Sequence, residues 1–222
     1  MSEAPVITFD GPSATGKGTI AGRVAAMLGF HLLDSGALYR VLALASHRSD
    51  IEPDNGAVIA ALAPGLPVEF NAGGGIRLHG EDVSTAIRTA LVDELASRIA
   101  ALPEVRKALL PWQRDFRRQP GLVAEGRDMG AVVFADAEVK FFLTASAEVR
   151  AKRRHKQLID KGLGARLPDL LRGLRSRDRR DEQRSISPLR PATGAIEIDT
   201  SQLSIDQVVD RVMQSIAARR GG

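Results

Sequence analysis

The sequence contains no cysteine among its 222 residues. This excludes disulfide bonds, thiolate zinc sites, iron–sulfur clusters and cysteine nucleophiles, and it fits a reducing compartment. The four histidines are scattered, none three or four residues from another, which argues against a metal site of paired histidines. No apolar run approaches the roughly 20 residues of a membrane-spanning helix. Residues 1–5 lack the features of a signal peptide, so we expect a cytoplasmic protein with no membrane partner.

Aromatic side chains are also few, with seven Phe, one Tyr and one Trp. Basic residues, by contrast, are concentrated between Arg150 and Arg190, where 14 Lys and Arg accompany 5 Asp and Glu. Such a segment indicates an anionic ligand. Nucleic acid is one alternative, but single strands are held largely by aromatic stacking, and Asp178, Asp181 and Glu182 interrupt the basic run. We therefore expect no nucleic-acid partner.

Short β-prone runs alternate with helical patterns over most of the chain. The predicted strands are 6–9, 30–33, 122–124, 139–143 and 195–198. The predicted helices begin near Lys17, after Asp34, at about 146, at about 168 and after Ser204. This alternation predicts an α/β fold with an open, doubly wound, five-stranded parallel sheet.

The middle of the chain breaks this alternation. Residues 68–70 and 76–78 flank a Gly-rich stretch at 71–75 and predict a hairpin, and helical patterns follow. We predict one domain, 1–222, with a core at about 1–63 and 106–222 and an insertion at about 64–105.

The strongest functional signal lies between the first predicted strand and helix. It consists of Gly11, Pro12, Ser13, Ala14, Thr15, Gly16, Lys17, Gly18 and Thr19. In a strand–turn–helix setting, backbone N–H groups converge on a phosphate, the helix N-terminus adds partial positive charge, and Lys17 reaches the transferred phosphate. The strict Walker pattern has Ser or Thr directly after the lysine. Here Gly18 intervenes, a variant that nucleoside monophosphate kinases show.

Two groups of basic residues share a helix face by their spacing. One group is Arg150, Arg153 and Arg154, and the other is Arg177, Asp181 and Arg184. For any single pair, a solvated surface is the simpler interpretation. A helix with arginines this dense repels itself unless an anion is bound, and a phosphate-bearing ligand supplies that anion.

Several strings of residues together carry a resemblance to one family. They are 10–13, 16–19, 33–40, 125–130, 177–178, 181, 184, 188–189, 191–192 and 198–200. On these residues the chain resembles the bacterial cytidylate kinases, which are P-loop nucleoside monophosphate kinases, from about Val6 to Ile216. The strings 33–40 and 126–130 are far more specific than the phosphate loop. An insertion of similar length also occurs in the monophosphate-binding region of these enzymes.

The resemblance implies phosphoryl transfer from ATP to CMP or dCMP, with Mg²⁺, giving ADP and CDP or dCDP in pyrimidine nucleotide metabolism. The acceptor is an anionic phosphate oxygen, so no general base is required and catalysis rests on positioning and charge neutralisation. ATP and CMP or dCMP are thus the expected small-molecule partners, and the family implies a monomer.

The resemblance also implies roles for individual residues. ATP phosphates would lie on residues 11–19, and the catalytic residues would be Lys17, Arg127, Arg150 and Arg154. Residues 150–167 would form a short lid that closes over the transferring group and excludes water. The CMP site would comprise Arg40, Arg127 and Arg184 for the phosphate, with Arg177 nearby, Ser35 and Asp181 for the sugar, and Ser97, Arg106 and Asp128 for cytosine.

Two positions depart from the family pattern. Ala14 stands where Gly is more common, so a positive φ there would strain the loop by roughly 1–3 kcal/mol. Glu125 stands where many relatives have Asp, and its longer side chain could still hold a Mg²⁺-bound water. Thr19 is the other candidate metal ligand.

Other functions remain open at this point. One is another small P-loop kinase, for uridylate, adenylate or a non-nucleotide acceptor such as shikimate, and Ser97, Arg106 and Asp128 discriminate among these. A shikimate-type acceptor would need a group that activates or positions a hydroxyl, and no residue clearly supplies one. Another alternative is a pseudokinase that binds ATP without turnover. The presence of Lys17, Arg127 and Arg184 argues against it.

Overall fold

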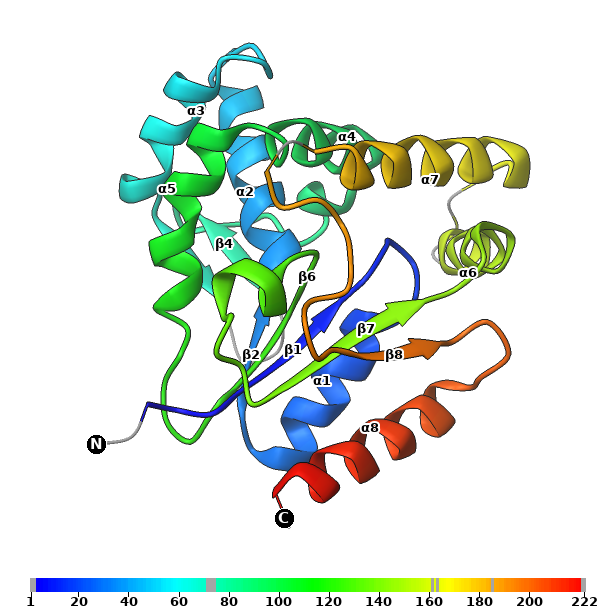
Figure 1. Cartoon of the computed structure of the whole chain (residues 1–222). Helices are drawn as coiled ribbons and strands as arrows, with labels where there is room; N and C mark the ends of the chain where they lie inside the picture. Colours follow the sequence, from blue (N-terminus) through cyan, green and yellow to red (C-terminus); the bar gives the residue numbers. More distant parts are fainter. Residues whose placement is uncertain (1–2, 71–74, 161, 163, 185, 221–222) are drawn as a thin grey trace. The chain divides into compact units, whose positions relative to one another are not determined.

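The computed structural model describes residues 3–70, 75–160, 162, 164–184 and 186–220 (Figure 1). In chain order the elements are β1 (Val6–Asp10), α1 (Lys17–Leu28), β2 (His31–Asp34), α2 (Ser35–Arg48), α3 (Gly56–Leu62), η1 (Ala63–Gly65), β3 (Val68–Phe70), β4 (Ile76–Leu78), β5 (Glu81–Asp82), η2 (Ala86–Arg88), α4 (Ala90–Ile99), α5 (Pro103–Arg114), β6 (Leu122–Gly126), η3 (Met129–Val133), β7 (Val139–Thr144), α6 (Ala147–Ile159), α7 (Leu167–Glu182), β8 (Ile196–Asp199) and α8 (Ile205–Arg220). The chain forms two compact units. We call Met1–Leu33 with Phe116–Gly222 the sheet unit, and Asp34–Asp115 the middle unit.

A five-stranded sheet, in the order β2-β6-β1-β7-β8, is the basis of the sheet unit. The central strand β1 pairs in parallel with β6 and with β7, and β7 pairs in parallel with β8. Every residue of β1 is buried, as expected for a strand covered on both faces. The predicted α/β fold with an open five-stranded parallel sheet is confirmed.

One face of this sheet is covered by α1 and α8 (Figure 1). Apolar residues of both helices pack against Ile7 and Phe9 of β1, and the Phe9 and Phe141 rings stack with centroids 5.0 Å apart. The helix α8 begins as predicted, because Ser204 and Gln207 exchange reciprocal side-chain-to-backbone hydrogen bonds in a capping box. The turn η3 packs on the other face, where an added Cβ at Gly130 would lie 2.7 Å from the hydroxyl of Thr8.

The middle unit contains α2 to α5 and a small antiparallel sheet of β3, β4 and β5. Its core includes the fully buried side chains of Leu42, Ile59 and Ile99. The predicted hairpin is present as β3 and β4, while residues 71–74 of its tip lie outside the described residues. The predicted insertion, 64–105, falls within this unit, and its boundaries stay a prediction.

Candidate active site

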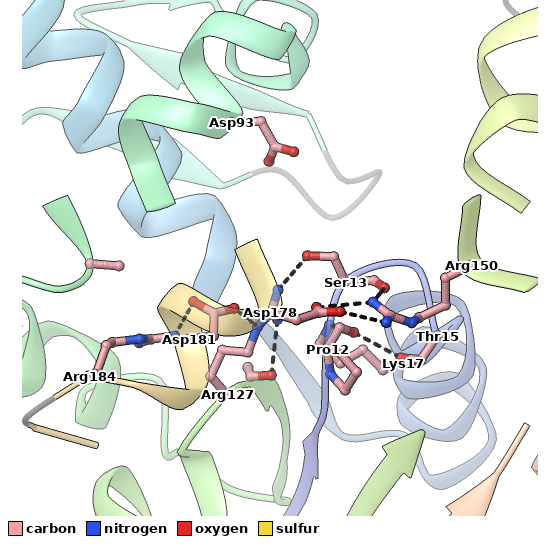
Figure 2. Close-up of polar contacts among 12 residues, drawn as sticks. Pro12, Ser13, Thr15, Lys17, Asp93, Arg127, Arg150, Asp178, Asp181 and Arg184 are labelled. Carbon is pink, nitrogen blue, oxygen red and sulfur yellow. Dashed lines mark hydrogen bonds and ion pairs between the residues drawn. The ribbon is translucent and has the colours of Figure 1, made fainter. Parts of the chain in front are cut away.

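The segment 11–16 connects the central strand β1 to α1 at the carboxyl edge of the sheet. Gly11 has a φ of 143°, and an added Cβ there would lie 2.1 Å from the carbonyl oxygen of Leu143, so no side chain fits. Lys17, at the first turn of α1, donates from Nζ to the Pro12 carbonyl at 3.2 Å, and the Thr15 hydroxyl donates to the same oxygen at 3.2 Å. The loop is therefore tightly folded, with the ammonium group lying over it (Figure 2).

Ala14 adopts the left-handed backbone conformation in which the sequence analysis expects strain. Its φ is 62°, in the region where an L side chain crowds the backbone. The strain expected for a positive φ at this position therefore applies to the loop.

Arg127 follows directly after β6 and links two parts of the sheet unit that are far apart in sequence. Its Nη2 donates to the Ser13 hydroxyl at 2.7 Å, and its Nε donates to Asp181 Oδ2 at 3.0 Å. Figure 2 shows this side chain between the phosphate loop and α7. Arg127, predicted to be catalytic and to bind the CMP phosphate, thus lies beside the predicted ATP loop.

Asp181 is a buried carboxylate among arginines. It forms ion pairs with Arg127 and with Arg184, the latter three residues further along the chain. Burial by itself would raise the pKa of Asp181, but the charges of Arg127, Arg184 and Arg177 outweigh burial and hold that pKa below its usual range. The carboxylate is therefore ionised at neutral pH.

In this cluster of Arg127, Arg177, Asp181 and Arg184, three guanidinium groups lie close enough to one carboxylate to lower its pKa. The buried Nε of Arg184 has no hydrogen-bond partner within the part of the chain that the structure describes. Buried polar atoms are nearly always hydrogen-bonded in native proteins. A bound phosphate oxygen would satisfy this donor.

The three predicted lid arginines differ in their surroundings. Arg150 is 4 % exposed and forms a two-point ion pair with Asp178, with N–O distances of 3.0 and 2.6 Å. Arg153 donates to the carbonyl of Thr15 at 3.2 Å and to the hydroxyl of Thr200 at 2.9 Å. Both therefore tie α6 to neighbouring parts of the sheet unit.

Arg150 also donates to the Ser13 carbonyl at 3.3 Å, so it contacts the phosphate loop directly. Arg154 is half-buried and, within the described ranges, forms no hydrogen bond or ion pair. Of the three arginines, Arg154 is the one whose charge no neighbouring group of the described chain compensates. The catalytic roles predicted for Arg150 and Arg154 stay predictions.

In the middle unit, Ser35 begins α2 and its hydroxyl accepts a hydrogen bond from Gln113 Nε2 at 3.1 Å. Both residues are buried. Arg40, one turn further along, pairs with Asp34 at 3.0 Å and with Asp93 at 3.8 Å. Its buried Nε has no hydrogen-bond partner among the residues that the structure describes, which again leaves a donor for an anion.

The two other predicted CMP residues of the middle unit lie on or near its helices. Ser97 is buried on α4, and Arg106 on α5 donates to the Tyr39 hydroxyl at 3.4 Å and to the Ala100 carbonyl at 3.3 Å. The predicted cytosine carboxylate, Asp128, belongs to the sheet unit, where it is buried immediately before η3.

Sequence reasoning assigned no role to several residues that hold the predicted ones. They are Gln113, which contacts Ser35, Asp178, which pairs with Arg150, and Thr200, which contacts Arg153. Asp178 and Thr200 lie in the strings of residues that carry the family resemblance, so the sequence did mark these two positions. Gln113 lies in an ordinary helical pattern and gave no signal.

The Glu125 carboxylate lies close to the start of α1. An added Cβ at Gly18 would lie 2.7 Å from Glu125 Oε1, so this carboxylate rests against the residue before Thr19. No group of three or more His, Asp or Glu residues with metal-binding proximity occurs in the described part of the chain. The Glu125 carboxylate and the Thr19 hydroxyl supply oxygen ligands of the type that fits Mg²⁺, which binds one or two protein ligands together with phosphate oxygens and waters.

A family model described as cytidylate kinase matches residues 7–218. The chain belongs to the cytidylate kinase family. Curated cytidylate kinases similar to it include those of Paraburkholderia phymatum, 58% identical over 96% of this chain and 92% of the relative, and of Pseudomonas fluorescens, 54% identical over 97% and 96%. Another, from Burkholderia pseudomallei, is 56% identical over 94% and 91%. The family membership expected from the motifs is confirmed.

One solved structure supports the fold alone. It is an uncharacterized protein from Eubacterium ventriosum with a TM-score of 0.51 and 14% identity, and the match covers 97% of this chain and 99% of that one. Within the described residues of this cytidylate kinase family member, no helix is both long and apolar enough to cross a membrane.

Proposed function

We propose that this chain is an ATP-dependent kinase that phosphorylates CMP and dCMP, giving ADP and CDP or dCDP. The observation that carries this proposal is its place in the cytidylate kinase family over nearly its whole length. In the reaction, a phosphate oxygen of CMP bonds to the γ-phosphorus of ATP while the bond from that phosphorus to the β–γ bridging oxygen breaks. ADP leaves with the electron pair, and no proton has to be removed from the acceptor.

We propose that residues 11–19 bind the phosphates of ATP. The strand–loop–helix geometry supports this role, because backbone N–H groups at the start of α1 and the ammonium of Lys17 provide donors and positive charge. Lys17 would then neutralise the charge that develops on the transferring group. Arg154, and Arg150 after release from Asp178, would supply further charge from a lid at 150–167.

We propose that the cluster of Arg127, Arg177, Asp181 and Arg184 binds the phosphate and sugar of CMP in the sheet unit, and that Asp128 accepts from the cytosine amino group. The buried Nε of Arg184, which has no hydrogen-bond partner among the described residues, supports the phosphate role. From the middle unit, the CMP residues would be Ser35 for the sugar, Arg40 for the phosphate, and Ser97 and Arg106 for the base.

We propose that Mg²⁺ accompanies ATP, held by the Thr19 hydroxyl and, through a water, by Glu125. When bound, the ion would offset the negative charge of the phosphate oxygens in the transition state. We also propose that the protein acts as a monomer in the cytoplasm, with nucleotides rather than nucleic acid or membrane as its partners.

A panel of acceptors tests this function. ADP formation from ATP and Mg²⁺ is measured in parallel with CMP, dCMP, UMP and AMP. We expect turnover led by CMP and dCMP. Turnover led by UMP or AMP would contradict the roles of Ser97, Arg106 and Asp128, and no turnover with any acceptor would contradict the kinase itself.

A further inference from the structure

Asp10 is a buried acidic residue that the proposed function does not use. It ends β1, directly before the phosphate loop, and is 3 % exposed. Its Oδ1 accepts the backbone N–H of Met129 and its Oδ2 accepts that of Gly130, both at 2.8 Å. Hydrogen bonds from backbone N–H groups to a carboxylate are stronger than those between neutral groups. Both oxygens of Asp10 are therefore engaged with one turn.

That turn, η3, begins with the two residues that Asp10 binds. The first N–H groups of a helical turn have no partner within it and need a capping acceptor. Asp128 stands at the N-cap position, where an aspartate ordinarily supplies this acceptor from its own side chain. The side chain of Asp128 makes no capping hydrogen bond to the described residues of this turn. The cap comes instead from Asp10, which lies 119 residues before Met129 in the sequence.

The capped turn rests directly on the strand that leads into the phosphate loop. An added Cβ at Gly130 would lie 2.7 Å from the hydroxyl of Thr8, two residues before Asp10. Arg127 and Asp128 immediately precede η3, so their backbone is held by the pairing of β6 with β1 on one side and by the Asp10 cap on the other. A single carboxylate thus joins the start of the phosphate loop to the segment that carries Arg127 and Asp128.

We propose that Asp10 is a positioning residue for the acceptor nucleotide: by capping η3 from β1, it fixes Arg127 and Asp128 relative to the phosphate loop. This inference rests on the proposed function, because it requires that Arg127 and Asp128 bind CMP. Asparagine cannot replace Asp10 in this role. It has one acceptor oxygen, and its amide group would face one of the two N–H donors and leave that donor unpaired.

The test is the variant Asp10→Asn, compared with wild type in ATP and CMP titrations. We expect the KM for CMP to rise roughly 10- to 100-fold, as for a small misplacement of binding groups. The KM for ATP should stay within about twofold, because the residues of the loop are unchanged. Backbone amide exchange at Met129 and Gly130, measured by NMR, should accelerate in the variant. If Asp10→Asn does not fold, Asp10→Ser retains one acceptor in a smaller side chain.

The matched control is Thr8→Val, on the same strand and the same face beneath η3. Thr8 is fully buried, and its hydroxyl has no hydrogen-bond partner in the described ranges, so this change alters packing without altering the cap. We expect wild-type kinetics for it. An active wild type with an unchanged CMP KM in the Asp10 variant would overturn the inference alone. A wild type that does not phosphorylate CMP would overturn the proposed function, whatever the variant does.

Discussion

Several arginines of the sheet unit are held by carboxylates of the same chain. Arg127 and Arg184 share Asp181, and Arg150 has Asp178. A carboxylate that accepts two or more guanidinium hydrogen bonds fixes the planar fork in one orientation before any ligand arrives. Part of the ordering that the proposed phosphate binding requires is therefore already present.

Loss of the Arg184 side chain should affect the binding of CMP much more than the binding of ATP. We expect Arg184→Ala to raise the KM for CMP by roughly 10- to 100-fold while the KM for ATP changes by less than about threefold, because a buried charge-assisted hydrogen bond to the acceptor is lost. Initial rates with each nucleotide varied in turn give both constants. The control is Arg172→Ala, an exposed arginine on α7 paired with Asp169. Equal losses for both nucleotides would show that Arg184 has another role.

Ala14 is expected to be a strained residue whose relief stabilises the protein. Because its φ is 62°, Ala14→Gly removes the crowding of a Cβ in the left-handed region. The gain is offset in part by the greater freedom of glycine in the unfolded chain, leaving about 0.5 kcal/mol of added stability. Urea unfolding measures it. Ala26→Gly, at an exposed position of α1, should instead lose up to about 1 kcal/mol, and a similar loss for both would contradict the strain.

At the scale of elements, much of the architecture was predictable because it depends on local signals. Buried apolar runs gave the strands, and Lys17 and Asp34 marked the starts of α1 and α2 as the structure has them. The turn η3 was not predicted, since its cap comes from Asp10 rather than from a neighbour. The contacts of Arg127 were equally hidden, because Ser13 lies 114 residues away in sequence.

A buried ion pair joins Arg150 on α6 to Asp178 on α7, and their side chains are 5% and 15% exposed. Removing one partner of such a pair leaves a buried charge without compensation. We expect Asp178→Ala to lower the free energy of unfolding by about 3 kcal/mol. The control is Asp169→Ala, on the same helix but in an exposed pair, with an expected loss below about 1 kcal/mol. Equal effects in urea unfolding would show that the buried pair does not anchor α6.

At the scale of the whole molecule, Asp10 gives stability an unusual dependence on pH. The pKa of Asp10 is raised from 3.8 to about 6, chiefly by burial and to a smaller extent by the charge of Asp128. The hydrogen bonds from Gly130 and Met129 and the charge of Lys17 act in the opposite direction. Between these values the folded protein holds a proton that the unfolded chain has lost. The contribution of Asp10 to the free energy of unfolding therefore falls as pH rises from about 4 to about 6.

Unfolding of wild type and Asp10→Asn across this window isolates that contribution. The stability of wild type relative to the variant should decline from about pH 4 to about 6 and then level off. Groups such as Asp181, whose pKa is lowered by its arginine partners despite burial, act in the opposite sense and lose stability as pH falls, but they are common to both proteins. A difference that does not vary with pH would contradict the raised pKa of Asp10.

The charge of the whole chain also bears on the nucleic-acid alternative. The basic segment from Arg150 to Arg190 contains 14 Lys and Arg, yet several of these residues are engaged with Asp178, Asp181, Asp169 and Glu148 of the same unit. Internal pairing reduces the charge that a polyanion could contact. These internal ion pairs account for part of the density of arginine in this segment, and the absence of a nucleic-acid partner stays a prediction.

The central claim is that the γ-phosphoryl group of ATP passes to the phosphate of CMP. The most direct measurement follows that group: wild-type protein is incubated with ATP labelled on the γ-phosphate, Mg²⁺ and CMP, and the labelled products are separated. We predict that the label appears in CDP in amounts equal to the ADP formed. Label recovered as inorganic phosphate, or remaining in ATP, would contradict phosphoryl transfer from ATP to CMP.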